Sequence, residues 1–434
     1  MNPRTIAARY GTPCFVYDLD EAAAACAGLL DALPTGSVLH YSLKANPHPA
    51  VAEVFARAGL RAEVSSTGEL VAALAAGFAP ASITYSGPAK TAGELDVAFR
   101  TGVRRFSVES HRDLLTVDAA ASRAGTRADC LLRINADRPA GGTGLAMTGV
   151  SSKFGVDLQT VLKDPSPFLQ TRSACICGLH LYMGTNLADE DALLDQFAIA
   201  LDMCGELAAA LDRTFDELDL GGGFGAPYAA PGPRPSFPTL RPRLEALLDQ
   251  RAAGWRGGSP IVSFESGRHL VASCGTLLTT VVDVKESKGQ RYVLLDSGVH
   301  HLGGLSGLRR LPAVQPEPVP LTGPAAEAAE VYEASAASDA SDARTVLDGE
   351  VFDGETHLAG PLCTPADQWG RRRDLPRLRP GDLVAVPNTG AYGLTASLLG
   401  FLSYPIPVEV VVSGGQPAAA SRLTLTRTPV KERI

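Results

Sequence analysis

The chain has 434 residues, of which 45% are hydrophobic and 20% are charged, and its formal net charge is −8 at pH 7. This length is enough for two domains and a large core, and the composition is that of an ordinary globular protein. The negative charge argues against a nucleic acid or an anionic membrane as the main partner.

The N-terminal stretch lacks the apolar segment of a secretory signal, and no run is long and apolar enough to span a membrane. Eight cysteines are scattered along the chain without the paired spacing of a metal site. We therefore expect a cytoplasmic protein with reduced thiols, most of them small core residues, and no bound metal.

Strand-like and helical stretches alternate up to about residue 270. A short strand over residues 13–18 precedes an alanine-rich helix over residues 20–32. Eight further strands are expected at 38–43, 61–65, 82–86, 105–108, 130–135, 176–182, 217–220 and 261–265. Helices are expected between them at 50–58, 68–76, 92–101, 111–124, 158–162, 189–211 and 240–251. This α/β pattern predicts a TIM (β/α)8 barrel of the alanine-racemase-like kind, with a doubly wound open sheet as the alternative.

The pattern changes after residue 270, where apolar runs follow one another without comparable helices. These runs lie at 277–282, 292–295, 383–386 and 408–412. We expect a barrel over residues 25–270 and a mostly β domain over residues 1–24 and 271–434. Residues 313–344 are rich in proline, alanine, serine and acids, and we expect part of them to form a low-complexity excursion from the β domain.

The most informative stretch surrounds Lys44, which follows a buried strand and precedes Asn46-Pro47. Proline suits the first turn of a helix, so Lys44 is expected at the carboxyl end of a strand, where α/β folds place their chemistry. An isolated lysine in this position is usually exposed and unreactive. The alternative is a lysine whose partly buried amine forms a Schiff base.

Polar or glycine-rich residues follow other predicted barrel strands as well. Arg133 lies on the fifth strand, and His180 and Tyr182 lie two residues apart on the sixth, so these two share a face. The seventh strand runs into Gly221-Gly222-Gly223-Phe224-Gly225, and the eighth ends in Glu265-Ser266-Gly267-Arg268. A single glycine-rich turn is more often only a turn, but several such features on one barrel rim indicate a site.

This combination of groups suits pyridoxal phosphate. The glycine run can present backbone N–H groups to a phosphate, and Arg268 can add a charged hydrogen bond. Barrels often bind phosphate in the loops after their seventh and eighth strands. Lys44 would form the imine, and Glu265 would keep the ring nitrogen protonated.

Two stretches of the β domain add candidates. Cys363 lies in Gly360-Pro361-Leu362-Cys363, and Tyr392 lies in Gly390-Ala391-Tyr392-Gly393. A lone cysteine is usually a buried structural residue, and a lone tyrosine is usually a hydrogen-bonded core residue. A cysteine in a glycine-proline turn followed by polar residues is nevertheless placed for exposure.

Taken together, the chain resembles the fold-type III pyridoxal-phosphate decarboxylases, the group that contains diaminopimelate, ornithine and arginine decarboxylases. The resemblance covers nearly the whole chain in the right order. It rests on motifs at Tyr41-Ser42-Leu43-Lys44-Ala45-Asn46, Gly68-Glu69-Leu70, Ser152-Lys153-Phe154-Gly155, Gly178-Leu179-His180, Gly221-Gly222-Gly223, Glu265-Ser266-Gly267-Arg268, Gly360-Pro361-Leu362-Cys363 and Gly390-Ala391-Tyr392-Gly393.

The resemblance implies a role for each matching residue. Lys44 would carry the cofactor, Glu265 would pair with its ring nitrogen, and Cys363 would return a proton to the substrate carbon after carbon dioxide leaves. The remaining cofactor contacts would come from His180, Tyr182, Thr185, Gly221, Gly222, Gly223, Gly267, Arg268 and Tyr392. Cys363 would come from the partner subunit, so the resemblance implies a head-to-tail homodimer with two shared sites.

Three positions depart from the family pattern. Tyr182 stands where a histidine often stacks on the cofactor ring, and Ser266 follows Glu265 where proline is usual. Cys363 is followed by Thr364-Pro365-Ala366-Asp367, whereas ornithine decarboxylases have an acid directly after this cysteine to receive a distal amine and diaminopimelate decarboxylases have a Glu-Ser context that reads a distal amino acid group. The pattern looks most like a branch in specialised biosynthesis that acts on carrier-bound or derivatised amino acids, such as citrate-linked ones, and Arg133 and Asp367 are candidate substrate contacts.

Three other functions remain open from the sequence. One is a diaminopimelate or basic amino-acid decarboxylase of primary metabolism. Another is an amino-acid racemase on the same barrel. Such racemases place an arginine near the ring nitrogen of the cofactor, whereas a carboxylate at that position, as in Glu265, favours decarboxylation. The last is a pyridoxal-phosphate-binding protein without turnover, against which the presence of Cys363 argues.

Overall fold

The computed structural model describes residues 2–137, 149, 151–303, 315–321, 355–372, 375 and 377–429. The chain divides into two compact units, a first of residues 1–20, 227–232 and 273–434 and a second of residues 21–226 and 233–272. Apart from residues 315–321, the low-complexity stretch 313–344 lies outside the described residues.

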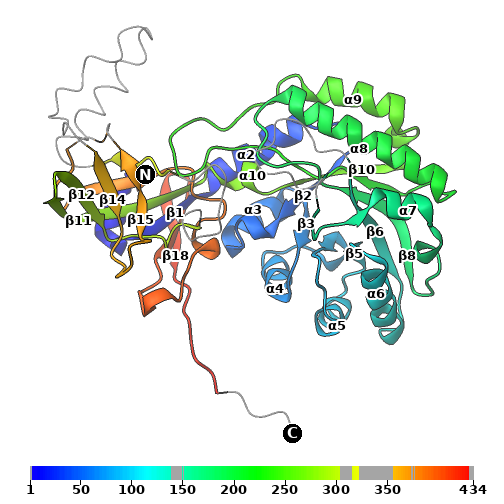
Figure 1. Cartoon of the computed structure of the whole chain (residues 1–434), viewed down its shortest axis with the longest axis horizontal. Coiled ribbons are helices and arrows are strands. Elements are labelled where there is room, and N and C mark those ends of the chain that lie inside the picture. Colours follow the sequence, from blue (N-terminus) through cyan, green and yellow to red (C-terminus); the bar gives the residue numbers. More distant parts are fainter. Residues whose placement is uncertain are drawn as a thin grey trace. The chain divides into compact units, whose positions relative to one another are not determined.

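The second unit is a closed barrel of parallel strands (Figure 1). Its strands are β2 (Val38–Ser42), β3 (Arg61–Val64), β4 (Ile83–Tyr85), β5 (Arg105–Val108), β6 (Ala128–Asn135), β8 (Ala174–Leu181), β9 (Glu217–Asp219) and β10 (Ile261–Ser266). Strand β10 pairs with β2, and β5 pairs with β6, so the ring of paired strands is closed and leaves no edge strand among the eight. The TIM barrel is therefore confirmed, and the open-sheet alternative is wrong. A two-residue strand, β7 (Val156–Asp157), also pairs with β6.

Helices surround the barrel strands in Figure 1. They are α2 (Leu19–Ala32), α3 (Pro49–Arg57), α4 (Thr67–Ala75), α5 (Ala92–Arg100), α6 (His111–Arg123), α7 (Leu158–Lys163), α8 (Glu190–Ala210), α9 (Leu240–Arg251) and α10 (Arg268–Val271). Local sequence explains several starts: the side chains of Ser66, Thr91 and Ser110 each accept a hydrogen bond from the backbone three residues later. Such caps fix where each helix begins and therefore where the preceding loop ends.

Charged residues fill the amino-terminal end of the barrel. Glu217, the first residue of β9, contacts Arg105 and lies 3.3 Å from Arg61, which are the first residues of β5 and β3. The hydroxyl of Ser263 donates a further hydrogen bond of 2.8 Å to Glu217. An ion cluster at this end of a barrel is typical of a role in stability, and it leaves the carboxyl-terminal rim for chemistry.

His40 lies next to this cluster and gives a pH-dependent contribution to stability. Burial lowers the pKa of His40 to about 4, and neither ring nitrogen makes a hydrogen bond within the described residues. The unfolded chain, with an ordinary histidine pKa, binds the proton first, so folding stability is complete above about pH 6.5 and is lost as the pH falls towards 4. We expect His40 alone to cost about 2 kcal/mol of unfolding free energy at pH 5.

Thermal melts of the wild type and of His40→Gln between pH 7 and pH 5 measure this contribution. The variant should lose less of its melting temperature on acidification, whereas His111→Gln, which alters an exposed histidine, should follow the wild type. Equal pH slopes for His40→Gln and the wild type would contradict the assignment.

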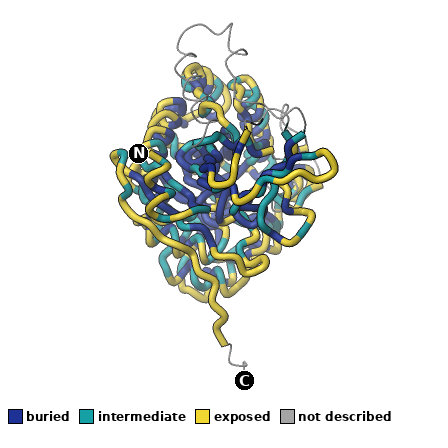
Figure 2. The backbone as a smooth tube through the Cα atoms, turned by 90° about the vertical axis from the view of Figure 1, so that its left-hand side faces the viewer, coloured by how far each residue is buried: buried dark blue, intermediate teal, exposed yellow. Residues whose placement is uncertain are grey.

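The first unit is built on a mostly antiparallel sheet. It contains α1 (Pro3–Tyr10), β1 (Cys14–Asp18), β11 (Gly275–Ser287), β12 (Gln290–Leu295), β13 (Val319–Pro320), β14 (Thr356–Ala359), β15 (Gln368–Arg372), β16 (Leu383–Val386), β17 (Val408–Ser413) and β18 (Gln416–Ser421). The four runs expected after residue 270 all lie within these strands. The described residues end in an exposed C-terminal stretch, residues 422–429, which Figure 2 shows in yellow.

Within the described residues, no helix has both the length and the apolar character that crossing a membrane requires.

Candidate active site

Lys44 lies on a short 3-10 turn at the carboxyl-terminal rim of the barrel. Strand β2 ends at Ser42, and the turn Leu43–Ala45 follows it directly. The turn buries Leu43 and Ala45, whereas the Lys44 side chain is 42% exposed. The chain therefore turns before the lysine, which shortens the expected strand, and the next helix begins at Pro49.

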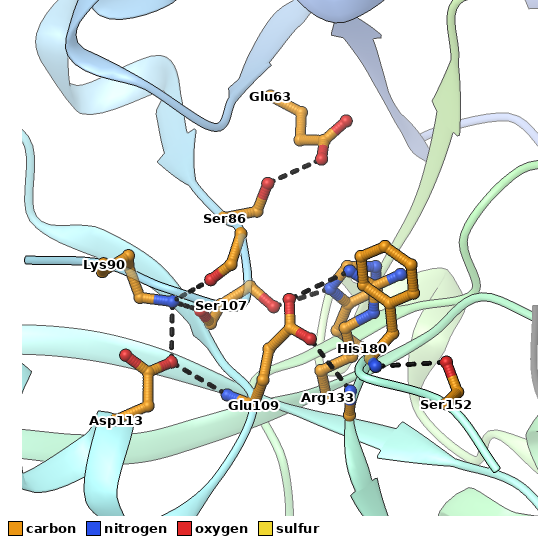
Figure 3. Close-up of polar contacts among 12 residues, drawn as sticks. Glu63, Ser86, Lys90, Ser107, Glu109, Asp113, Arg133, Ser152 and His180 are labelled. Carbon is orange, nitrogen blue, oxygen red and sulfur yellow. Dashed lines mark hydrogen bonds and ion pairs between the residues drawn. The ribbon is translucent and has the colours of Figure 1, made fainter. Parts of the chain in front are cut away.

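The Lys44 amine is paired with Glu63, which lies on the neighbouring strand β3. Lys44 Nζ lies 3.0 Å from Oε2 and 3.2 Å from Oε1 of Glu63. The hydroxyls of Ser42 and Ser86 each donate a hydrogen bond of 2.6 Å to the same carboxylate (Figure 3 shows Ser86 with Glu63). Burial favours the neutral acid, but the charge of Lys44 and these hydrogen bonds together keep the pKa of Glu63 below its ordinary value.

The sequence places Glu63 near a strand end but does not reveal this pairing. The signal in the sequence is an acid within two residues of a predicted strand's carboxyl end, and the same signal indicates Glu265. Glu63 holds Lys44 in place and leaves its amine accessible at the rim.

Glu265, His180 and Asp219 form a compact buried group inside the barrel. Their nearest potential ligand atoms all lie within 4.8 Å of one another, and His180 Nε2 lies 3.5 Å from Glu265 Oε1. His180 Nδ1 shares a hydrogen bond of 2.7 Å with the Ser107 hydroxyl (Figure 3). Such a group is also close enough to hold a cation, an option that the sequence motifs do not predict.

Burial sets the protonation of this group. It raises the pKa of Glu265 well above its ordinary value, and the neighbouring Glu63 and Asp219 act in the same direction. It also lowers the pKa of His180 well below its usual range. Burial thus favours the neutral form of Glu265, and a cation placed beside it would favour the ionised form.

The glycine run after β9 is packed too closely to accept side chains. A Cβ on Gly221 would lie 2.3 Å from the Leu181 carbonyl oxygen, and one on Gly222 would lie 2.1 Å from that of Glu265. Gly221 and Gly223 also have φ of +69° and +106°, a conformation that favours glycine. The loop is therefore fixed against both β8 and β10.

Gly222→Ala tests this packing. We expect it to destabilise the protein by about 1–3 kcal/mol and to weaken pyridoxal-phosphate binding, because the new methyl group meets backbone that cannot move aside. Thermal melts and fluorescence titration with the cofactor measure the two effects. Gly205→Ala is the matched control, since a Cβ at this helical position meets nothing within 4 Å. Equal stability and affinity in Gly222→Ala would refute the close approach.

Four other predicted cofactor contacts lie near this loop or near the Lys44 turn. A Cβ on Gly221 would lie 3.1 Å from Cδ2 of Tyr182, so the tyrosine ring lies against the loop. Thr185 follows Gly184, whose carbonyl oxygen lies beside Gly223. Gly267 approaches the Lys44 turn, because its Cβ would lie 2.8 Å from that of Ala45, and Arg268 then starts α10. The structure thus gathers these residues on the same rim as Lys44.

Arg133 is held by a buried network that crosses several strands (Figure 3). Its Nη1 lies 3.2 Å from Glu109 Oε1, and its guanidinium lies 4.9 Å from the centre of the Phe154 ring and 5.9 Å from that of Tyr182. The other oxygen of Glu109 accepts a hydrogen bond of 2.9 Å from Gly155 N. These contacts position Arg133, and its role towards substrate stays a prediction.

The first unit contains Cys363, Asp367 and Tyr392. Cys363 is exposed, whereas Asp367 is 3% exposed. Asp367 Oδ1 accepts a hydrogen bond of 2.8 Å from Val299 N, and Oδ2 accepts one of 2.7 Å from Leu362 N. Tyr392 has φ of +55°, and its carbonyl accepts a hydrogen bond of 3.0 Å from the Tyr228 hydroxyl. The contacts of Asp367 favour a role in holding the Cys363 turn over the expected contact with substrate.

The fold and this rim define the class: a TIM barrel whose carboxyl-terminal rim brings together a lysine, a buried acid and a closely packed glycine loop. The model of the family described as "Pyridoxal-dependent decarboxylase, pyridoxal binding domain" matches residues 19–272. The chain belongs to this family: it is a pyridoxal-phosphate-dependent amino-acid decarboxylase, a carbon-carbon lyase.

Relatives extend the match to nearly the whole chain. An L-glutamyl-(BtrI acyl-carrier protein) decarboxylase of Niallia circulans is 31% identical over 94% of this chain and 90% of its own length. A diaminopimelate decarboxylase of Zymomonas mobilis is also 31% identical, over 95% and 90%. The solved diaminopimelate decarboxylase of Helicobacter pylori in complex with L-lysine is 24% identical, covers 95% of this chain and 94% of its own, and superposes with a TM-score of 0.76, which shows the same fold.

The barrel residues fit pyridoxal phosphate. The cofactor needs an amine, an acid beside its ring nitrogen and a close backbone approach to its phosphate. Lys44, Glu265 and the glycine run supply these three. Gly222 has no room for a side chain, because a Cβ there would clash with the Glu265 carbonyl oxygen, so its backbone stays bare. His180 Nε2 is buried without a hydrogen-bond partner among the described residues, so it could form a hydrogen bond with a polar group of the cofactor.

Proposed function

We propose that this decarboxylase removes the α-carboxylate of an amino acid whose side chain is carrier-bound or otherwise derivatised, in a specialised biosynthetic pathway. The carrier-protein glutamyl decarboxylase among its relatives supports this substrate class. A glutamyl group that is decarboxylated at Cα must be linked through its side-chain carboxyl, as a thioester or an amide. Its distal end then carries no charge.

The observation that carries the proposal is the environment of Asp367. It is the only acid in the seven residues that begin at Pro361, and both of its oxygens already accept backbone hydrogen bonds. An ammonium group at the far end of a basic amino acid would have to share this one buried carboxylate with the two backbone donors that it already accepts from. A buried unpaired charge is costly, so a basic substrate is disfavoured.

Diaminopimelate decarboxylation is the second candidate. Several relatives carry that name, and the one from Zymomonas mobilis is as similar as the carrier-protein enzyme. The absence of a glutamate next to Cys363 argues against this substrate.

The proposed roles of the residues follow from their chemistry. When bound, pyridoxal phosphate supplies the electron sink that holds the negative charge left on Cα after carbon dioxide departs. Lys44 would attach the cofactor through its amine, and Glu265 would hold a proton at the ring nitrogen. The glycine run, Thr185, Arg268 and Tyr392 would hold the phosphate, and Cys363 would deliver a proton to Cα.

We further propose a homodimer whose sites are shared, with Cys363 of the partner subunit completing each site. Mixing Lys44→Ala with Cys363→Ala subunits tests this arrangement, because hybrid dimers then contain one intact site. Random exchange should restore about a quarter of the wild-type activity. No recovery, together with a monomeric mass in light scattering, would contradict the shared site.

A substrate panel tests the proposed specificity. Release of carbon dioxide is compared for L-glutamate loaded on a carrier protein through its side chain, a citrate-linked amino acid, free glutamate, diaminopimelate, lysine, ornithine and arginine. We expect a derivatised amino acid to give the highest kcat/KM. Preference for diaminopimelate would support the second candidate, and loss of optical activity without gas would indicate a racemase.

A further inference from the structure

A pocket with a volume of about 410 Å³ opens on the second unit, and none of the residues that line it is a predicted cofactor or substrate contact. Helix α2 contributes Gly28 and Asp31, and the segment 234–238, which precedes α9, contributes a second wall. His269 of α10 also lines it. Its volume is within the range of small-molecule sites.

Arg234 gives this pocket a positive charge that the protein balances only weakly. Its side chain is 20% exposed, and its Nη2 lies 3.6 Å from Oε1 of Glu21, which is longer than a hydrogen bond. Arg234 Nε is buried and makes no hydrogen bond within the part of the chain that the structure describes. Asp31, the acid among the lining residues, has a 90% exposed side chain and lies 3.8 Å from Arg241 instead. A guanidinium without a close carboxylate favours an anionic ligand, above all a carboxylate that it can bind through two N–H groups.

The other lining groups beside Arg234 are apolar or neutral. Phe237 lies between two prolines that also line the pocket, and its ring centre lies 5.3 Å from that of His269. Burial, together with the charge of Arg234, lowers the pKa of His269 to about 4, so this ring is neutral near pH 7. A ligand with one carboxylate and an apolar body therefore matches both parts of the pocket.

The pocket shares its aromatic residues with the glycine run of the cofactor site. His269 Nδ1 lies 2.9 Å from the Gly225 carbonyl oxygen, and a neutral ring can only donate to that oxygen. Gly225 N in turn donates a hydrogen bond of 2.7 Å to the Leu187 carbonyl. The ring centre of Phe224, the residue before Gly225, lies 5.8 Å from that of Phe237. A ligand that packs against Phe237 and His269 therefore also stabilises the position of the glycine run.

We propose that this pocket is a regulatory site for a small organic carboxylate with an apolar body, and that its occupation slows the loss of pyridoxal phosphate. Two ligands that stabilise the same arrangement of the glycine run must strengthen each other's binding. The site is separate from the substrate contacts, so the proposal holds whichever amino acid is decarboxylated.

Three compounds provide a matched test by calorimetry on the holoenzyme: 3-phenylpropanoate, 3-phenylpropanamide and acetate. The amide lacks the charge and acetate lacks the apolar body. None of the three carries an amine that could form an imine with the cofactor. We expect 3-phenylpropanoate to bind with an affinity about tenfold or more above that of either control.

Cofactor loss provides the second measurement. The holoenzyme is transferred to cofactor-free buffer, and the decay of its visible absorbance is followed with and without saturating 3-phenylpropanoate. We expect the carboxylate to slow this decay by about fivefold. The amide at the same concentration should leave the rate unchanged.

Two variants place the binding in this pocket. Arg234→Gln removes the charge. Gly28→Leu keeps Arg234 but fills the pocket, and it should fold, because a Cβ on Gly28 makes only an ordinary contact of 3.6 Å with Arg234 Nη1 and leucine is favourable in a helix. Both variants should lose the binding of 3-phenylpropanoate, whereas Arg57→Gln, which alters an arginine of α3 with a 78% exposed side chain, should keep it.

Four results would each overturn the proposal: no binding of 3-phenylpropanoate, equal affinity for the acid and the amide, an unchanged rate of cofactor loss, or unchanged binding in the two pocket variants. The first three need only the wild type, so a variant that fails to fold does not rescue the proposal. The outcome is also independent of the substrate panel, because none of these measurements requires turnover.

Discussion

Lys44→Ala should abolish decarboxylation and remove the visible absorbance of the bound cofactor. Lys44 is the proposed point of covalent attachment, and its amine is held 3.0 Å from Glu63 at the barrel rim. A positioned intramolecular amine is hard to replace by one from solution, so we expect kcat to fall by about a thousandfold or more. Absorbance spectra of the purified protein and carbon dioxide release measure the two effects.

Two control variants separate attachment from charge pairing. Lys44→Arg retains a cation for Glu63 but has no amine for attachment, so it should be as inactive as Lys44→Ala and closer to the wild type in thermal stability. Lys163→Ala removes an exposed lysine at the end of α7 and should leave both activity and absorbance intact. If Lys44→Ala kept the absorbance band, another amine would hold the cofactor.

The barrel was predictable from the sequence because its strands are buried on both sides. Runs such as 38–43 and 176–182 are short, largely apolar and separated by amphipathic stretches, and this alternation leaves few other folds. Strand ends were less certain: the chain leaves β2 at Ser42 and forms a 3-10 turn before Lys44, which apolar pattern alone does not specify.

Short strands of the first unit were missed for a related reason. Strand β15, Gln368–Arg372, has one buried residue, Trp369, among its five, so it carries no alternating apolar pattern. Its place in the sheet comes from pairing with β14, which sequence periodicity does not report.

In the candidate site, the sequence predicts which residues matter but not which residues they contact. Motifs indicate Lys44, Glu265 and the glycine run, because each lies directly at the carboxyl end of a predicted barrel strand within a recognisable sequence context. The pairing of Lys44 with Glu63 depends on the register of β2 against β3, and this register appears only in the folded sheet. The sequence predicts a substrate contact for Asp367, because it shows the charge of this residue but not the backbone of Val299, 68 residues away, that it binds.

Cys363→Ala should retain cofactor binding and lose most of the decarboxylase activity. The thiol is the proposed proton donor to Cα, and alanine removes that proton without touching the barrel residues. A positioned acid contributes about 10²–10⁴-fold, so we expect kcat to fall by roughly this amount. Carbon dioxide and product amine should be measured separately, because a proton delivered to the wrong atom gives gas without the expected amine.

The matched control is Cys175→Ala, which removes a partly buried cysteine of β8 and should leave turnover unchanged. The spectrum of Cys363→Ala should match that of the wild type, which distinguishes a lost proton donor from a lost cofactor.

Asp367→Asn should give an intermediate effect. One of the two backbone hydrogen bonds must fail, since an amide nitrogen cannot accept, so the Cys363 turn loosens while the thiol remains. Partial activity in Asp367→Asn and full spectral retention in Cys363→Ala would together assign proton delivery to the thiol and its placement to the carboxylate, whereas unchanged turnover in Cys363→Ala would refute the role of the thiol.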